Sequence, residues 1–449
     1  MSNILIKNAR LVNEGKTIEG DILIKGDRIE KIASSISAPE NSEVVDVKGK
    51  MVIPGIIDDQ VHFREPGLTH KEDIATGSRS AAAGGVTSYM EMPNTKPTAT
   101  TQELLQKKYE IAAKTSTVNY SFYMGATNDN VDEVLKTNPK EVCGVKIFMG
   151  SSTGNMLVDS ETTLDNLFSK VPMLIATHCE DEATIRKNLA TYKKKYDDVH
   201  PYMHPLIRNV EGCYLSSKLA SDLARKHGTR LHILHISTEK EISLFDNNIP
   251  LKDKKITSEV CVHHLYFDDG YYHSLGNRVK CNPAVKTASD REALLKGLKD
   301  GYFDVIATDH APHTIEEKSK PYLEAPSGLP LIQHSMTVML SFYHRGELSM
   351  EFIVDKMCHS PAILFDVNER GYLREGYYAD LAIVDPNLKW QVTKQNIAYK
   401  CGWSPLENFD LKGKVTDTLC NGEWVYRNNK LTGIKSGQRL MFTPRSQSS

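Results

Sequence analysis

The sequence lacks the long apolar segment that a membrane helix requires. None of its hydrophobic runs approaches the roughly 20 residues that are needed to cross a bilayer. It also lacks a surplus of charge of either sign, since the formal net charge is −2. A nearly neutral chain has no general electrostatic attraction for nucleic acid or for anionic lipid. The sequence therefore predicts neither a membrane protein nor a nucleic-acid-binding protein.

The cysteines lack the spacing of a disulfide framework, and no C-x-x-C pair occurs. The 8 cysteines are scattered along the chain, and apolar neighbours around most of them are typical of buried, reduced thiols. Disulfides are rare in reducing compartments. The N-terminus enters strand-like sequence at once and has no signal-peptide pattern. We therefore expect a cytoplasmic protein with free thiols.

The two ends of the chain share a strand-rich pattern that the middle lacks. Short apolar runs broken by turn residues occur at 4–6, 20–24, 29–33, 380–384 and 418–426. Asn421-Gly422, inside the last run, indicates a hairpin. We expect one small β-sandwich domain formed by the N- and C-terminal segments, residues 1–52 and 370–445.

Residues 53–369 follow a repeated pattern of strand, loop and helix. Helical stretches such as 101–115 and 212–227 follow several short apolar runs, and such runs suit parallel strands buried on both faces. Eight strands alternating with helices predict an α/β fold, a (β/α)8 TIM barrel, with its active site at the carboxyl ends of the strands. The expected strands are Gly55–Asp59, Gly85–Met90, Val118–Met124, Gly144–Phe148, Met173–Thr177, Arg230–His235, Ile256–Val262 and Asp304–Thr308.

Residues able to bind a metal fall at the ends of five of these strands. They are His62, Lys146, His178, His235 and Asp309. Any single one of the 16 histidines is more often a surface or core residue than a ligand. Five such groups at one end of a barrel would be costly if unpaired, because buried polar groups lose their hydration. Imidazole and carboxylate ligands together suit zinc or a similar divalent ion, so the sequence predicts a metal site.

Lys146 is the only charged residue in the apolar run Val145–Met149. A buried lysine shifts readily towards the neutral amine. A neutral amine can take up carbon dioxide to form a carbamate, which is an anionic oxygen donor able to bridge two ions. An ordinary ion pair with a neighbouring acid is the alternative, and the residues alone leave both open.

Six motifs occur in a fixed order along the chain: Val52–Asp58, Met92–Thr95, Thr177–Glu180, Leu234–Ser237, Asp304–His313 and Gly376–Leu381. Any one of them is a weak signal. As an ordered set spanning essentially the whole chain, they resemble the amidohydrolase superfamily and, within it, the class I dihydroorotases. The resemblance implies a metal-dependent hydrolase that reversibly cyclises N-carbamoyl-L-aspartate to (S)-dihydroorotate in de novo pyrimidine biosynthesis.

The resemblance also implies a role for each strand-end residue. Lys146 would be carboxylated and would bridge two Zn²⁺ ions, and His178 and His235 would complete the site of one ion. His62 and Asp309 would serve the other ion, and Asp309 would also shuttle the proton. The substrate-binding positions of the family match Arg64, Asn94, Asn282 and His313. A homodimer, and association with aspartate transcarbamoylase, are further expectations.

One residue departs from the family pattern. The first barrel strand of the family carries two histidines one residue apart, and Gln60 stands at the first of these positions. A neutral amide oxygen is a poorer zinc ligand than imidazole. We therefore expect one tightly held ion and a second, partial site in which Gln60 is a doubtful ligand. The alternative that Gln60 leaves open is an inactive relative that scaffolds aspartate transcarbamoylase.

Arg64 bears on the choice of substrate. A guanidinium matches a carboxylate bidentately, and dihydroorotate has a ring carboxylate that hydantoins and dihydropyrimidines need not have. Hydantoinases (dihydropyrimidinases) and allantoinases are the nearest alternatives, but they lack this arginine. A surface arginine paired with Glu65 or Glu72 is the other interpretation. The polar stretch 314–329 after the eighth strand predicts a mobile cover near the site.

Overall fold

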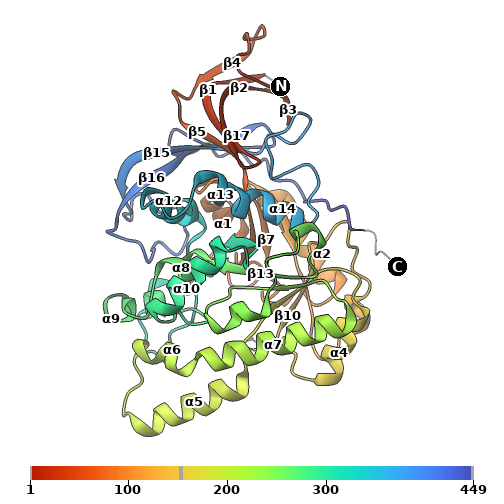
Figure 1. The fold of residues 1–449 in the computed structure, drawn as a ribbon, viewed down its shortest axis with the longest axis vertical. Helices are drawn as coiled ribbons and strands as arrows, with labels where there is room; N and C mark the ends of the chain where they lie inside the picture. The colour runs from red at the N-terminus through yellow and green to blue at the C-terminus, as the bar shows by residue number, and fades with distance from the viewer. Residues whose placement is uncertain (1–2, 151–154, 446–449) are drawn as a thin grey trace.

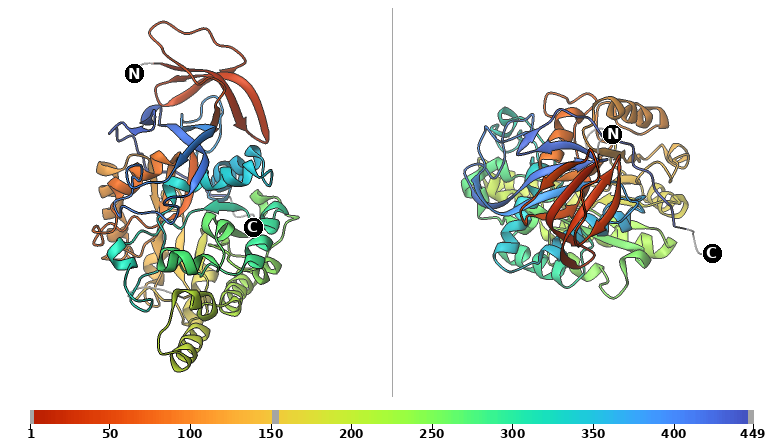
Figure 2. Two further views of the ribbon diagram at one scale, coloured as in Figure 1. Left: turned by 90° about the vertical axis from the view of Figure 1, so that its left-hand side faces the viewer. Right: turned by 90° about the horizontal axis from the view of Figure 1, so that it is seen from above.

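The computed structural model describes residues 3–150 and 155–445. Both ends of the chain contribute to one nine-stranded sheet, the terminal sheet, in the order β18-β17-β16-β15-β5-β1-β2-β3, with β4 paired to β1. The N- and C-terminal strands meet where β5 pairs antiparallel with β15. Figures 1 and 2 show these strands gathered at one end of the molecule. Their bounds are β1 (Ile4–Asn13), β2 (Lys16–Lys25), β3 (Arg28–Ala33), β4 (Glu43–Asp46), β5 (Met51–Pro54), β15 (Leu381–Gln391), β16 (Asp410–Cys420), β17 (Glu423–Arg427) and β18 (Lys430–Leu431).

The terminal sheet is β-sandwich-like and has a hydrophobic core of its own. Ile6 and Ile22 from the N-terminal strands pack in one cluster with Leu381 from β15. The predicted hairpin is present, because Asn421 and Gly422 have the positive φ values of 51° and 75° that a tight turn between β16 and β17 requires. The strand-rich ends of the sequence are thus confirmed, and the domain limits 1–52, 53–369 and 370–445 remain a proposal.

The middle of the chain forms a parallel (β/α)8 barrel. Two sets of strands, β6-β7-β8 and β9 to β14, are joined by the chain between β8 and β9. The ring closes where the backbone N–H of His62 donates to His310 at 2.7 Å. Each expected strand is present to within a few residues, so the predicted barrel is confirmed. The strands are β6 (Ile56–Val61), β7 (Val86–Glu91), β8 (Asn119–Phe122), β9 (Met124–Gly125), β10 (Val145–Phe148), β11 (Ile175–His178), β12 (Leu231–Ile233), β13 (Ile256–Cys261) and β14 (Val305–Ala307).

The helices begin and end at residues suited to capping. Thr101 accepts a hydrogen bond from the backbone of Leu104 to start α2, and Gly228, with φ of 70°, ends α7. The two helical stretches expected from the sequence are both present. The α-helices are α1 (Ile74–Ala83), α2 (Gln102–Thr115), α3 (Val131–Val134), α4 (Glu161–Lys170), α5 (Glu182–Lys195), α6 (His204–Ile207), α7 (Val210–His227), α8 (Val262–Tyr266), α9 (Tyr271–Leu275), α10 (Ala288–Lys299), α11 (Ile315–Lys318), α12 (Ser335–His344), α13 (Met350–Val354) and α14 (Ser360–Leu364).

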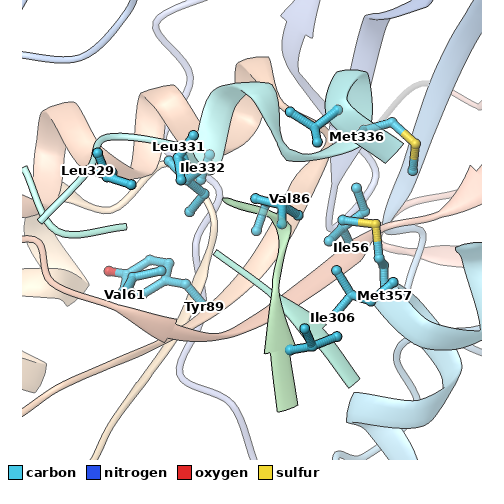
Figure 3. Packing of buried hydrophobic residues seen from close by; sticks show 14 of the residues in the cluster. Ile56, Val61, Val86, Tyr89, Ile306, Leu329, Leu331, Ile332, Met336 and Met357 are labelled. Atoms are coloured by element: carbon cyan, nitrogen blue, oxygen red, sulfur yellow. The ribbon is translucent and has the colours of Figure 1, made fainter. Parts of the chain in front are cut away.

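The main core lies between the barrel strands and the surrounding helices. Figure 3 shows Ile56 of β6 and Val86 of β7 beside Met336 of α12, and all three are fully buried. Burying an aliphatic side chain of this size stabilises a fold by about 1.5–3 kcal/mol. This packing holds the strands in register, so that their carboxyl ends meet at one mouth. No helix in the described part of the chain is long and apolar enough to cross a membrane.

Candidate metal centre and active site

Two imidazoles face each other at the carboxyl ends of β11 and β12. Nδ1 of His178 lies 2.9 Å from Nε2 of His235. Glu180 accepts a hydrogen bond from Nε2 of His178 at 3.0 Å, which leaves the lone pair on Nδ1. Burial lowers the pKa of both rings, that of His235 well below its usual range, so both are neutral at pH 7. Two neutral imidazoles whose ring nitrogens lie this close together are suited to bind one divalent ion.

A second pair lies on the other side of the mouth. Nε2 of His62 lies 3.1 Å from a carboxylate oxygen of Asp309, and Nδ1 of His62 lies 2.9 Å from the side-chain oxygen of Asn94. With the amide in this orientation, Nδ1 donates to Asn94 and Nε2 presents its lone pair to the carboxylate. Burial lowers the pKa of His62, although the hydrogen bond and charge of Asp309 oppose it. A lone pair facing a carboxylate is repulsive unless a cation lies between them, so this contact also fits a metal.

Lys146 lies within β10 and is 1% exposed. Burial lowers the pKa of its amine to about 7, against the opposing charge of Asp309. Among the described residues, no carboxylate forms a salt bridge with Lys146, so the ion-pair interpretation has no partner at this position. An amine that is half neutral near pH 7 is chemically able to form a carbamate, and the carbamate itself remains a proposal.

The two predicted ligand pairs depend on Lys146 to complete a site. The described residues contain two groups of three histidine, cysteine or acidic side chains close enough to hold an ion, and neither group includes His178, His235, His62 or Asp309. Each pair therefore lacks a third donor of these types. A carboxylated Lys146 would supply it, because its amine interacts electrostatically with both histidines and with Asp309. The donor set present thus fits a divalent ion.

Backbone strain gathers at the same mouth. Arg64, His235 and Asp309 have positive φ values of 66°, 41° and 45°. Each such conformation costs about 1–3 kcal/mol for a residue with a side chain, and it persists only where the surroundings impose it. Strained positions of this kind cluster at functional sites. Three of the ten candidate residues share this feature, which supports a common role.

Arg64 is buried and lies beside the other candidate residues. Its Nε donates to the carbonyl of Pro312 at 3.1 Å, and one terminal nitrogen lies 3.1 Å from His313. Burial lowers its pKa to about 10, so it stays charged at neutral pH. In the described ranges no carboxylate forms a salt bridge with it. The interpretation of a surface arginine paired with Glu65 or Glu72 is therefore wrong.

His313 and Asn282 differ in how firmly they are held. His313 contacts Lys71 through Nδ1 at 2.9 Å and the carbonyl of Ser327 through Nε2 at 2.9 Å. The side-chain oxygen of Asn282 is buried and has no hydrogen-bond partner within the described ranges. Its neighbours are fixed, because the carbonyl of Cys281 accepts from His204 at 2.7 Å. An unpartnered amide oxygen beside the mouth is suited to a substrate N–H group.

Gln60 is buried and contacts Cys261. It is 1% exposed, and its side-chain oxygen lies 3.9 Å from the thiol sulfur of Cys261 on β13. No hydrogen bond joins it to His62 or Asp309. Its part in a second metal site therefore stays doubtful, and the partial second ion stays a prediction.

The segment 314–329 adjoins the site and is tied to the barrel. It begins with the short helix α11, and the ammonium of Lys318 donates to the carbonyls of Lys280, Pro326 and Gly328 at 2.9–3.0 Å. The carbonyl of Ser327, in the same segment, contacts His313. The segment thus lies where a cover would lie, and its mobility stays a prediction.

Sequence reasoning missed several groups around the site. Glu180 orients His178. Burial alone would raise the pKa of the Glu180 carboxyl, but the charge of Arg208 and the hydrogen bond and charge of His178 together hold it low. Glu180 lies within a motif already noted, so the carboxylate two residues after His178 was a usable signal. The two groups of potential ligands in the described ranges were also missed: Cys261, His263 and His264, and Asp59, His232 and Glu259.

The comparisons with known proteins agree with this geometry. The sequence model of the amidohydrolase family matches residues 51–425 of this chain. The chain is 31% identical to a dihydroorotase of Methanosphaera stadtmanae over 96% of this chain and 97% of the relative. It is 33% identical to a dihydroorotase of Methanosarcina mazei over 96% of each chain.

The solved structures give the same fold. The L-hydantoinase (dihydropyrimidinase) of Arthrobacter aurescens superposes with a TM-score of 0.93 at 27% identity, covering 98% of this chain and all of that one. A dihydropyrimidinase of Brevibacillus agri superposes with a TM-score of 0.88 at 22% identity, which bears on the fold alone. The chain therefore belongs to the amidohydrolase family, where it groups by sequence with the dihydroorotases.

Proposed function

We propose that this chain is a dihydroorotase, an enzyme that reversibly cyclises N-carbamoyl-L-aspartate to (S)-dihydroorotate with loss of water. The observation that carries the proposal is Arg64, a buried guanidinium near Asp309 that forms no salt bridge with any carboxylate among the described residues. A buried charge without a counter-ion is costly, and a substrate carboxylate would supply the counter-ion. Full-length relatives that carry the name dihydroorotase support the same substrate.

The residues proposed to hold the metal are His178, His235 and Lys146 for one ion, and His62 and Asp309 with Lys146 for a partial second one. Zn²⁺ is the ion that this mixture of imidazole and oxygen donors suits best. When bound, such an ion supplies Lewis-acid activation of water and of the scissile carbonyl. Glu180 orients His178 by accepting a hydrogen bond from its Nε2, which leaves Nδ1 as the nitrogen that would hold the ion.

Asp309 is proposed to move the proton. Its carboxylate lies at the mouth and is 7% exposed, close to both His62 and Arg64. In the hydrolytic direction it would take the proton of the attacking water and pass it to the departing ring nitrogen. In the biosynthetic direction it would take the proton from the ureido nitrogen of carbamoyl-aspartate and pass it to the oxygen that departs as water. One group then acts as base and as acid in turn.

Substrate positioning is assigned to Arg64, Asn94, His313 and Asn282. The guanidinium of Arg64 would hold the ring carboxylate. Its Nε already donates to the carbonyl of Pro312, and one terminal nitrogen lies beside His313 at the barrel mouth. Asn94 would hold His62 in place and contact the same carboxylate. The free oxygen of Asn282 would accept from a ring N–H group.

A substrate panel tests the proposal. The zinc-loaded chain is assayed with dihydroorotate, with a hydantoin and with allantoin, and cyclisation of carbamoyl-aspartate is followed in parallel. We expect turnover of dihydroorotate and carbamoyl-aspartate only. Preference for the hydantoin would favour the hydantoinase alternative, which the structural likeness to the Arthrobacter aurescens protein supports. No turnover of any substrate by metal-loaded protein would favour the inactive scaffold.

Assembly and location are proposed with the same function. All 8 cysteines are free and buried, which suits a reducing compartment such as the cytoplasm. A homodimer is proposed, as is association with aspartate transcarbamoylase. Sedimentation of the purified chain, alone and with aspartate transcarbamoylase, tests both.

A further inference from the structure

A second group of ionisable side chains lies inside the barrel. Asp59 of β6, His232 of β12 and Glu259 of β13 are each 0% exposed. One ligand atom from each lies within 4.8 Å of the other two. Because β6 is not a hydrogen-bonded neighbour of β12 or β13, the group reaches across the barrel. None of these side chains belongs to the proposed catalytic set.

The carboxylates of this group are poorly satisfied by the protein. Neither oxygen of Asp59, nor Oε2 of Glu259, has a hydrogen-bond partner in the described part of the chain. Oε1 of Glu259 is occupied, because it accepts from the backbone N–H of His235 at 3.0 Å and from the thiol of Cys261 at 3.2 Å. Within the same ranges no lysine or arginine forms a salt bridge with either acid. Buried carboxylates are expected to be paired or to coordinate a metal.

His232 presents one particular nitrogen to these acids. Its Nδ1 lies 2.9 Å from the hydroxyl of Thr257, and that hydroxyl donates its own hydrogen to the carbonyl of Leu231 at 3.1 Å. Nδ1 must therefore be the donor, and Nε2 is left to face the carboxylates. Nε2 lies 3.2 Å from Asp59 and 3.8 Å from Glu259.

The spacing of these atoms and the hydrogen bond left unmade favour a metal ion over a proton. Although Asp59 is only 3.2 Å from Nε2, neither Nε2 nor the Asp59 oxygens complete a hydrogen bond within the described ranges. A shared proton prefers a nearly straight N–H···O arrangement. Around a tetrahedral ion with bonds of about 2.0–2.2 Å, ligand atoms lie about 3.4 Å apart and each oxygen is about 35° off the nitrogen axis. The distances from Nε2 of His232 to Asp59 and to Glu259, 3.2 and 3.8 Å, lie on either side of about 3.4 Å and are compatible with an ion between the three side chains.

We propose that Asp59, His232 and Glu259 bind a divalent metal ion of the zinc type inside the barrel. Two carboxylates neutralise the charge of the ion, and the imidazole supplies the nitrogen that such ions favour. The ion ties β6 to β12 and β13 across the barrel. Because Glu259 also holds the backbone of His235, the site steadies a residue of the mouth. The proposal does not depend on the reaction proposed above.

Metal counting with matched variants tests the site. The full chain is loaded with ZnCl₂, passed through gel filtration and analysed for bound zinc, in parallel with Asp59→Asn and His232→Gln. The control is Asp58→Asn, which alters the adjacent buried carboxylate that Thr308 already satisfies. We expect Asp59→Asn and His232→Gln to hold one zinc fewer per chain than the unaltered protein and the control. Equal zinc in all four proteins would overturn the proposal.

Anomalous diffraction decides the question if these variants fail to fold. Crystals of the unaltered, zinc-loaded chain are measured at the zinc absorption edge. A peak among Asp59, His232 and Glu259 is the expected result, and its absence would overturn the inference. A peak only between His178 and His235 would reject the barrel ion and leave the proposed function standing. A peak only in the barrel would support the ion and count against the proposed catalytic metal.

Discussion

Buried polar groups of the terminal sheet have partners within the protein, whereas several at the barrel mouth have none among the described residues. In the terminal sheet, Asp21 accepts from the backbones of Asn8 and Ile36 at 3.0 and 2.9 Å. Asp380, beside the same sheet, binds the guanidinium of Arg370 and accepts from the backbone of Asn421 at 2.8 Å. Each buried charge there is matched by groups of the protein itself.

At the barrel mouth such matching is incomplete. Nδ1 of His235, Nδ1 of His264, both ring nitrogens of His263 and the amide oxygen of Asn282 have no partner among the described residues. An unsatisfied buried polar group costs about 1–3 kcal/mol, so it persists only where something else requires it. The sheet is therefore arranged for stability, and the mouth is arranged for ligands. Substitutions at the mouth should therefore change activity more than stability, and substitutions in the sheet should do the reverse.

The largest expected effect follows from Asp309→Asn. The side chain keeps its shape but can no longer accept and return a proton, so kcat should fall by about 10³-fold or more. The free energy of unfolding should change little. Steady-state assays and thermal unfolding of the zinc-loaded protein measure the two quantities. A kcat within tenfold of the unaltered enzyme would remove Asp309 from the reaction.

Arg64→Lys should raise KM for dihydroorotate by about 100-fold. It replaces a planar fork with a point charge, and the charged hydrogen bonds lost are each worth about 1.5–3 kcal/mol. Arg79→Lys, on the exposed face of α1, is the matched control and should leave KM unchanged. If the two variants had the same KM, Arg64 would not bind the substrate carboxylate.

Arg370→Met tests whether the ion pair beside the terminal sheet serves stability and not activity. Removing one partner of a buried ion pair should lower the free energy of unfolding by roughly 3–5 kcal/mol, because Asp380 is left without its counter-ion. KM and kcat of the folded enzyme should not change. Lys107→Met, which breaks an exposed pair with Glu103, should be without measurable effect on stability. Lost activity in folded Arg370→Met would show that the two regions are coupled.

The smallest expected effect concerns pH. Burial lowers the pKa of Lys146 to about 7, below the value of about 10.4 for an exposed lysine. In metal-free protein the unfolded state therefore binds more protons between these values, and stability should rise with pH across that window. Carbamate formation needs the neutral amine, so uptake of ¹³C-bicarbonate, followed by NMR, should be half-maximal near pH 7. Lys146→Met should show neither effect, and a signal confined to pH 9 and above would contradict the account.

Much of the barrel could be predicted from the sequence, because parallel strands are short apolar runs and their carboxyl ends must meet. From the sequence alone, that rule predicts that His62, His178, His235 and Asp309 meet at one mouth. The hairpin at Asn421 could also be predicted, because the Asn-Gly pair favours a tight turn by local chemistry. Such features depend on residues that are near one another in the chain.

Contacts across the barrel could not be predicted in this way. In the sequence, Asp59 is only the last residue of one expected strand, and His232, one of 16 histidines in the chain, lies inside another. Their approach depends on the diameter of the barrel and on a register shift in the pairing of β6 with β7 between Asp58 and Val61. The contact of Gln60 with Cys261 depends on the same stretch of β6.

The central claim is that His178, His235 and Lys146 share a divalent ion that the reaction requires. The most direct measurement is a zinc titration of chelator-treated protein in which bound zinc and carbamoyl-aspartate cyclisation are determined on the same samples, with His178→Ala beside the unaltered chain. The account predicts that activity is absent without zinc, returns in proportion to zinc held by the unaltered chain, and does not return in His178→Ala. Full activity in the metal-free protein, or undiminished recovery in His178→Ala, would contradict it.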